Sequence, residues 1–130
     1  MPSLHLLFSI KNNVFQLGNY TVYLSTNKTS DLSEGMAAKY NLERKQSLSM
    51  LNVSILRDSD KKSVAAKIDL EVKNLLGQNK KITASTIIEN SYISYAFISS
   101  ISNQETLLYK LKISPENKYM KDIQYSKKFY

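Results

Sequence analysis

Few residues in this 130-residue chain are suited to catalysis: it has no cysteine or tryptophan, one histidine, three glycines and two prolines. The lack of cysteine excludes a disulfide scaffold, a cysteine metal site and a thiol nucleophile. Three scattered glycines do not form a phosphate-binding loop. The single histidine, His5, lies in an apolar run near the N-terminus, which argues against a serine–histidine–acid triad. We therefore expect no enzymatic activity, no cofactor and no metal.

The sequence also lacks an apolar run long enough to cross a membrane, which takes about 20 residues. Leu4 to Ile10 is a short apolar run that His5 and Ser9 interrupt. No basic segment precedes this run and no small-residue cleavage site follows it, so it is not a complete signal peptide. We interpret residues 1–13 as a signal-peptide remnant or a first strand, and residues 14–130 as one domain. A remnant would mark a secreted protein, whereas a true start at Met1 would leave the protein in the cytoplasm.

Positive charge is in excess, with 18 lysine or arginine residues against 11 acids and a net charge of +7. Only Arg44 and Arg57 are arginines. Specific readers of phosphates and bases rely on arginine, so we expect no nucleic-acid partner. The excess is greatest near the C-terminus, where Lys118, Lys121, Lys127 and Lys128 are candidates for contact with an anionic surface. The alternative is an ordinary solvated strand face.

Strict alternation of apolar and charged residues marks the segment from Ser63 to Leu76. Five apolar residues at even positions oppose charged residues at odd positions, which predicts a half-buried strand. Gly77 predicts a turn, with a returning strand from Lys81 to Glu89 in a hairpin. Further strands are expected at 20–25, 51–55, 92–101, 105–114 and 123–129, and a short helix at 33–40 capped by Ser33. The predicted fold is an all-β antiparallel sandwich, an immunoglobulin-like meander of about seven strands with one short helix.

Two acidic pairs are candidates for chemical sites. Asp69 and Glu71 share a strand face about 7 Å apart, near the spacing of glycosidase carboxylates. Lys67 and Lys73 flank them on that face and would keep both ionised, whereas a general acid needs a raised pKa. An exposed charge ladder is the better interpretation. The loop acids of Asp58-Ser59-Asp60 lack the third ligand and the glycine of a calcium loop.

Five short motifs occur in an order that resembles the domain of unknown function 4426 family of Gram-negative bacteria. They are Phe15-Gln16-Leu17-Gly18-Asn19-Tyr20-Thr21-Val22-Tyr23, Leu51-Asn52-Val53-Ser54-Ile55-Leu56, Asn74-Leu75-Leu76-Gly77-Gln78, Asn103-Gln104-Glu105-Thr106-Leu107 and the terminal Lys128-Phe129-Tyr130. The resemblance runs from Val14 to Tyr130. It implies a secreted, envelope-facing β domain without assigned activity, so no catalytic residue carries over. Such proteins usually begin with a full signal peptide, and here only a stub resembles its end.

Three functions fit these observations. The first is a non-catalytic periplasmic or envelope-associated binding or accessory module. The second is a carrier that holds an apolar or lipid-like ligand between the sheets, and the third is a binder of anionic surfaces through the C-terminal lysines. The partner would be an unknown protein or envelope component. Exposed strand edges could pair to form a dimer, but the sequence determines neither the oligomeric state nor the edge that would pair.

Overall fold

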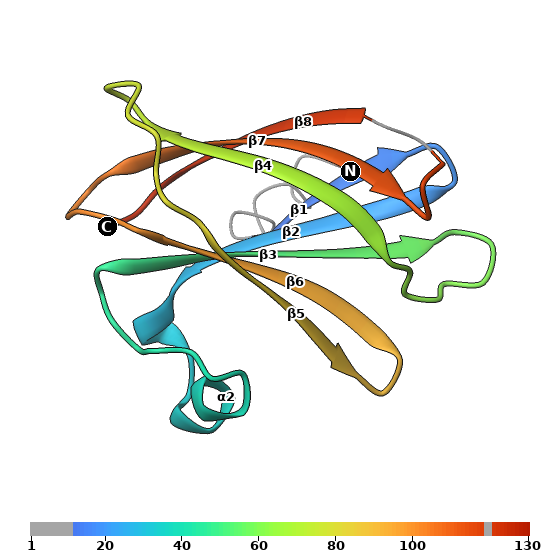
Figure 1. The fold of residues 1–130 in the computed structure, drawn as a ribbon, viewed down its shortest axis with the longest axis horizontal. Coiled ribbons are helices and arrows are strands. Elements are labelled where there is room, and N and C mark those ends of the chain that lie inside the picture. The colour runs from blue at the N-terminus through green and yellow to red at the C-terminus, as the bar shows by residue number, and fades with distance from the viewer. Residues whose placement is uncertain (1–11, 119–120) are drawn as a thin grey trace, which may run out of the picture.

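A computed structural model of the chain describes residues 12–118 and 121–130. These residues form eight strands, a 3-10 turn and one short α-helix, in two antiparallel sheets that pack face to face (Figure 1). The five-stranded sheet has the order β1-β2-β3-β6-β5 and the three-stranded sheet the order β4-β7-β8. The predicted all-β sandwich with one short helix is therefore confirmed. The elements are β1 (Asn12–Leu17), β2 (Tyr20–Lys28), η1 (Thr29–Asp31), α2 (Glu34–Lys39), β3 (Leu48–Arg57), β4 (Ala66–Asn74), β5 (Thr83–Glu89), β6 (Tyr92–Ser100), β7 (Thr106–Pro115) and β8 (Lys121–Lys128).

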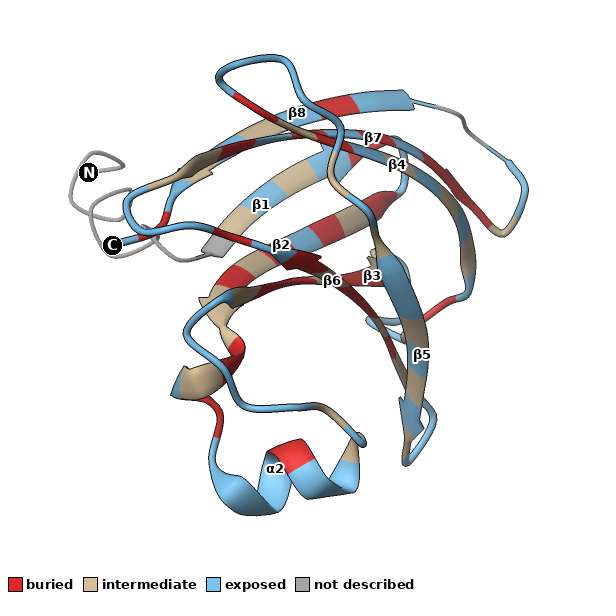
Figure 2. Cartoon of the chain, turned by 60° about the vertical axis from the view of Figure 1, so that its left-hand side comes forward, coloured by how far each residue is buried: buried red, intermediate tan, exposed pale blue. Residues whose placement is uncertain are grey.

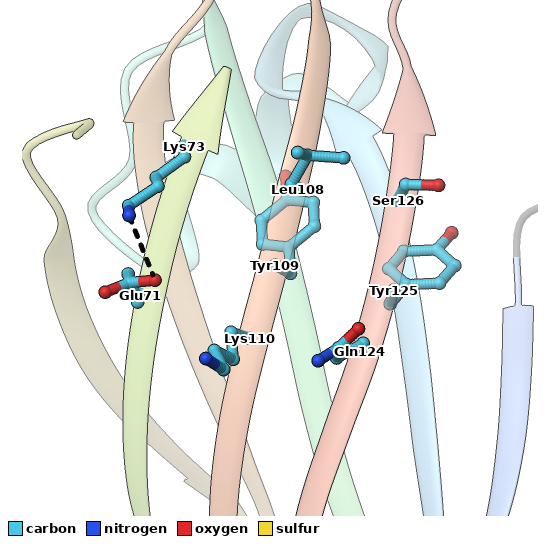
Figure 3. A pocket seen from close by; sticks show the side chains of 8 residues that line it. All are labelled: Glu71, Lys73, Leu108, Tyr109, Lys110, Gln124, Tyr125 and Ser126. Carbon is cyan, nitrogen blue, oxygen red and sulfur yellow. Dashed lines mark ion pairs between the residues drawn. The ribbon is translucent and has the colours of Figure 1, made fainter. Parts of the chain in front are cut away.

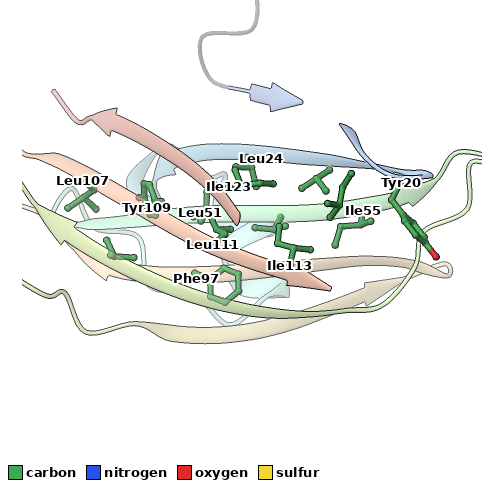
Figure 4. Close-up of a cluster of buried hydrophobic side chains, with 14 of the residues drawn as sticks. Tyr20, Leu24, Leu51, Ile55, Phe97, Leu107, Tyr109, Leu111, Ile113 and Ile123 are labelled. Carbon is green, nitrogen blue, oxygen red and sulfur yellow. The ribbon is translucent and has the colours of Figure 1, made fainter. Parts of the chain in front are cut away.

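Apolar side chains at alternate strand positions fill the space between the sheets (Figure 4). Val22 and Leu24 of β2 face this space from one sheet, and Leu111 and Ile113 of β7 face it from the other, all with 0% exposure. Figure 2 shows the buried residues concentrated on the inner strands, while β5 at the sheet edge is mostly exposed or intermediate. The alternation in the sequence therefore identified the buried faces of β2, β3, β4 and β7 correctly. It was wrong for β5, where Ala84, Thr86 and Ile88 were expected on the apolar face and are exposed, because β5 is an edge strand.

The turn at Gly77 was predicted correctly, but the hairpin beyond it was not. Gly77 has a φ of +80°, which favours glycine, and a single bridge joins Lys73 to Asn79. The chain then crosses to the other sheet, so β4 pairs with β7 and β5 pairs with β6. The loop after β3 is similar: a single bridge joins Leu56 to Ser63, and the chain then crosses from the five-stranded sheet to β4 in the three-stranded sheet. β4 is thus joined at both ends to strands of the opposite sheet.

Helix α2 begins where the sequence predicts. The backbone N–H of Met36 donates to the hydroxyl of Ser33 at 3.0 Å, which caps the first turn. Ala37 packs with Met50 and Ala96 on the outer face of the five-stranded sheet. This helix therefore covers part of a face that would otherwise meet solvent.

The first strand begins at Asn12, two residues before the predicted start of the domain. His5 and the apolar run at 4–10 lie outside the described residues. No helix in the described part of the chain is long and apolar enough to cross a membrane.

Candidate functional site

The structure places the four candidate lysines at the two ends of one strand. Lys118 and Lys121 lie at the turn between β7 and β8, whereas Lys127 and Lys128 lie where β8 ends. The strand rises by about 20 Å from Lys121 to Lys127, at about 3.3 Å per residue. The four therefore form two pairs and not one cluster, because β8 is extended.

Lys127 and Lys128 face a hollow of about 530 Å³ at the end of the sandwich. Lys28, which sequence analysis did not single out, joins them from the end of β2 and donates to the backbone carbonyl oxygen of Tyr130. Asp31 is the single acid along its lining. We call this feature the basic hollow; it is lined by Thr26, Asn27, Lys28, Ser30, Asp31, Gln46, Asn103, Lys127, Lys128, Phe129 and Tyr130.

The C-terminal residues form one wall of the basic hollow. Phe129 is 3% exposed, and its backbone N–H donates to the carbonyl of Glu105 at 2.9 Å. The Lys128 ammonium lies 5.1 Å from the centre of the Tyr130 ring, within range of a cation–π contact. Lys28 is bonded to the main-chain oxygen of Tyr130, and Asp31 is the one acidic side chain of the lining, so the ammonium groups of Lys127 and Lys128 leave the hollow with an excess of positive charge suited to a phosphate, sulfate or carboxylate group.

The acidic pair lies on the outer face of the three-stranded sheet, and Glu71 of the pair lines a hollow of about 390 Å³ (Figure 3). Asp69 and Glu71 are both exposed, and they stand across from Lys112 and Lys110 of β7. Lys73 lies 3.8 Å from Glu71, as the dashed line in Figure 3 marks. Each carboxylate thus has a lysine on the neighbouring strand, an arrangement that suits a charge ladder and gives neither acid a buried setting.

A smaller hollow, of about 220 Å³, lies between α2 and the outer face of the five-stranded sheet. Met36 and Tyr40 line it from the helix region, while Met50 lines it from β3. Glu89 at its rim is paired with Lys39. Sequence analysis missed this hollow because it depends on where α2 folds back, which no local pattern indicates.

The loop acids serve the structure of the loop. Asp60 accepts from Arg57 at 2.7 Å, and the backbone N–H of Lys62 together with Arg57 holds the pKa of Asp60 below its usual value. Asp58 accepts from the Thr21 hydroxyl at 2.6 Å, and this bond and one from Gln16 lower the pKa of Asp58. Within residues 12–118 and 121–130, no three histidine, cysteine or acidic side chains gather in a way that could hold a metal.

The family model for the domain of unknown function DUF4426 matches residues 14–130. A DUF4426 family protein from Pseudomonas aeruginosa PAO1 is similar in structure, with a TM-score of 0.79 and 21% identity over 92% of this chain and 95% of that one. FetP of uropathogenic Escherichia coli strain F11 is similar in two structures. A copper-bound variant has a TM-score of 0.62 and 13% identity over 92% of this chain and 95% of that one. The as-isolated protein has a TM-score of 0.59 and 10% identity over 92% of each chain.

At these identities the solved structures show a shared fold alone. No curated protein matches the chain at a significant level. The family model, in contrast, spans nearly all of the described residues, and the five motifs that suggested the resemblance lie within its limits. The chain therefore belongs to the DUF4426 family, a domain of unknown function.

Proposed function

We propose that this domain is a non-catalytic binding module of the cell envelope that holds an anionic group in the basic hollow. The observation that carries the proposal is the convergence of Lys28, Lys127 and Lys128 from two different sheets on one hollow with a single acid. Lysines scattered over solvated faces would not converge in this way. The exposed setting of Asp69 and Glu71 among lysines supports a module without acid–base catalysis.

A periplasmic location is part of the proposal. Its support is the secreted character that the sequence resemblance implies, together with the fold shared with FetP, whose as-isolated structure came from protein expressed in the periplasm of E. coli BL21(DE3). Fractionation of the native host, with the full-length gene, tests this location. Recovery of the protein only in the cytosol would contradict it.

The carrier hypothesis has less support. Leucine, isoleucine and valine side chains from both sheets occupy the space in which an apolar ligand would lie. The hollows lined by Lys127 and by Glu71 open at the surface and carry charged groups. A binder of an anionic group fits these surfaces better than a carrier of an apolar one.

The two lysine pairs provide a matched test of the basic hollow. The variants K127Q/K128Q and K118Q/K121Q each remove two positive charges from the same strand region. We expect the first to elute from a heparin column at clearly lower salt than the second, because only the first pair lines the hollow. K28Q added to the first variant should lower retention further. Equal shifts for the two double variants would show that net charge alone governs retention, and would overturn the proposed site.

A further inference from the structure

Two adjacent leucines project from the turn between β4 and β5. Leu75 is 71% exposed and Leu76 is 83% exposed. The core of the sandwich takes up neither side chain, although both belong to the Asn74-Leu75-Leu76-Gly77-Gln78 motif. Exposed apolar side chains scattered singly are ordinary, but two neighbours at the tip of a turn form a small apolar projection. We call this pair the leucine tip.

The buried side chain of Asn74, which is 5% exposed, holds the turn that carries the leucine tip. The Asn74 side-chain oxygen accepts from the backbone N–H groups of Leu76 at 3.1 Å and Gln78 at 3.0 Å. Its amide nitrogen donates to the Gln78 side chain at 2.8 Å and to Glu105 at 3.1 Å. An asparagine that bonds its own turn in this way fixes the turn's conformation. The leucines are therefore exposed because the turn is built to present them.

An ion pair beneath the turn adds to this support. The Lys80 ammonium lies 2.8 Å from a Glu105 carboxylate oxygen, and the two side chains are only 15% and 14% exposed. Burial alone would raise the pKa of Glu105, but hydrogen bonds from Lys80, the Ser102 backbone and Asn74 hold it below its usual value. The turn after β4 and the turn before β7 are thus tied together through charged and polar groups.

The leucine tip and the basic hollow lie at the same end of the sandwich. In the three-stranded sheet, Asn74 stands across from Leu107, which stands across from Lys127. Two strand spacings, or about 10 Å, separate the backbones of Asn74 and Lys127. The C-terminus and the turn after β4 share this end of the molecule in Figure 1. Lys73 precedes the tip on β4, and the exposed Lys81 follows it.

We propose that this end of the sandwich docks on an anionic lipid surface, with Leu75 and Leu76 inserted at the boundary between headgroups and acyl chains. Lys127 and Lys128 of the basic hollow, with Lys81, then contact the anionic headgroups. The inference rests on the proposed function of the basic hollow and names its partner. Partial burial of apolar side chains and attraction of nearby lysines to anionic lipid are the two contributions that hold peripheral proteins at a membrane.

Charge and shape favour a lipid surface over a discrete small ligand. Lys127 lies two strands away from the base of the leucine tip, while Lys73 and Lys81 flank the tip in sequence, so the positive charge at this end extends beyond the basic hollow. The nearby carboxylate of Glu105 is neutralised by Lys80, so it does not repel an anionic surface. An extended plane of headgroups satisfies separated lysines at once, whereas a single phosphate reaches only those of the hollow.

Vesicle binding tests the proposal with a matched pair of variants. L75S/L76S removes the leucine tip, and V14T/I88T removes two other large apolar side chains, which are 54% and 68% exposed on β1 and β5. We expect the wild type to bind vesicles of phosphatidylcholine mixed with phosphatidylglycerol and not phosphatidylcholine alone. L75S/L76S should bind the mixed vesicles about tenfold more weakly, and V14T/I88T should bind like the wild type. Circular dichroism confirms that each variant is folded.

A second measurement uses the absence of tryptophan from the chain. Leu76→Trp introduces the only indole, and its emission should shift to the blue when the mixed vesicles are added. Ile88→Trp, as the control, should show no shift. Unshifted indole emission from the Leu76→Trp variant while it is bound to vesicles would overturn insertion. A shift that follows protein concentration in the absence of lipid would also overturn it, since the tip would then pack against a second copy.

The two proposals fail in different ways. If L75S/L76S binds mixed vesicles as the wild type does, insertion of the leucine tip is wrong and the basic hollow stands. If the wild type binds neither heparin nor mixed vesicles, both proposals are wrong. Retention of L75S/L76S on heparin at wild-type salt, with vesicle binding lost, is the result that supports both.

Discussion

The two stacked tyrosines of the three-stranded sheet differ in how their hydroxyl groups are satisfied. The ring centroids of Tyr109 and Tyr125 are 5.9 Å apart. The Tyr125 hydroxyl lies 3.2 Å from the Thr26 hydroxyl of the opposite sheet, which is a hydrogen bond across the core. The Tyr109 hydroxyl is buried without a hydrogen-bond partner in the described part of the chain. The Ser49 hydroxyl, which donates to the Ser99 carbonyl, lies near the Tyr109 hydroxyl without hydrogen-bond geometry to it.

These two tyrosines should respond in opposite ways to loss of the hydroxyl. Tyr109→Phe removes an unsatisfied buried polar group, so we expect the free energy of unfolding to stay level or rise by up to about 1 kcal/mol. Tyr125→Phe loses the bond to Thr26, and should lower it by about 1 kcal/mol. Urea unfolding of the two variants measures both. A loss of stability in Tyr109→Phe equal to that in Tyr125→Phe would show that the Tyr109 hydroxyl has a partner.

At the scale of an element, helix α2 depends on its cap more than most helices do. It has only six residues, too few to be stable alone, and Ala37 is its one buried residue. The Ser33 hydroxyl accepts the Met36 backbone N–H in its first turn. Local opening of this helix would uncover the hollow that Met36 and Tyr40 line.

Removal of the cap should therefore loosen α2 without unfolding the sandwich. Ser33→Ala costs about 1 kcal/mol of helix stability, which is about a fivefold increase in the population of the open helix. We expect the Met36 amide to exchange its hydrogen correspondingly faster, while amides of β2 and β3 keep their wild-type rates. Ser33→Asp, which restores a capping oxygen, should bring the Met36 rate back. Faster exchange across β2 and β3 would contradict a local effect.

Strand β4 shows how far sequence patterns reach at this scale. Its alternation of apolar and charged residues from Val64 to Val72 predicted a half-buried strand, because consecutive side chains of a strand point to opposite faces of the sheet. The pattern carries no information about which edge pairs with which neighbour, so the hairpin with β5 was expected in place of the observed pairing with β7. Pairing is decided by how the two sheets pack, and that depends on residues far away in the chain.

The candidate site was predicted in part for the same reason. Lys127 and Lys128 were singled out by their charge, and the structure places both at the basic hollow. Lys28 was missed because it lies about one hundred residues away in sequence and meets them only when β2 and β8 pack in opposite sheets. The leucine tip could be found in the sequence as a motif, but its exposure could not, since two adjacent leucines usually pack inside.

At the scale of the molecule, an ionic network joins the two sheets at the end opposite the basic hollow. Arg57 at the end of β3 lies 2.8 Å from Glu116, which follows β7, and the Tyr20 hydroxyl of β2 donates to Glu116 at 2.7 Å. The bonds from Arg57 and Tyr20 hold the pKa of Glu116 below its usual value. Glu105 has a lowered pKa at the other end. Carboxylates with depressed pKa values therefore lie at both ends of the sandwich, and the Glu116 carboxylate joins strands of the two sheets.

This arrangement predicts acid sensitivity of the whole fold. A carboxylate whose pKa is lower in the folded state favours folding when it is ionised, so its contribution is complete above the unfolded pKa, about 4.5 for glutamate. The contribution is lost as the pH falls through the folded pKa. We expect the urea midpoint to be level from about pH 7 to about pH 5 and to fall steeply below about pH 4.5.

Glu116→Gln should have a lower midpoint at about pH 7 and a shallower fall below about pH 4.5, because glutamine does not titrate. Glu43→Gln, which replaces an exposed acid away from this network, is the control and should keep the steep fall. If Glu116→Gln fell as steeply as the wild type, Glu116 would not be one of the groups through which acid separates the sheets.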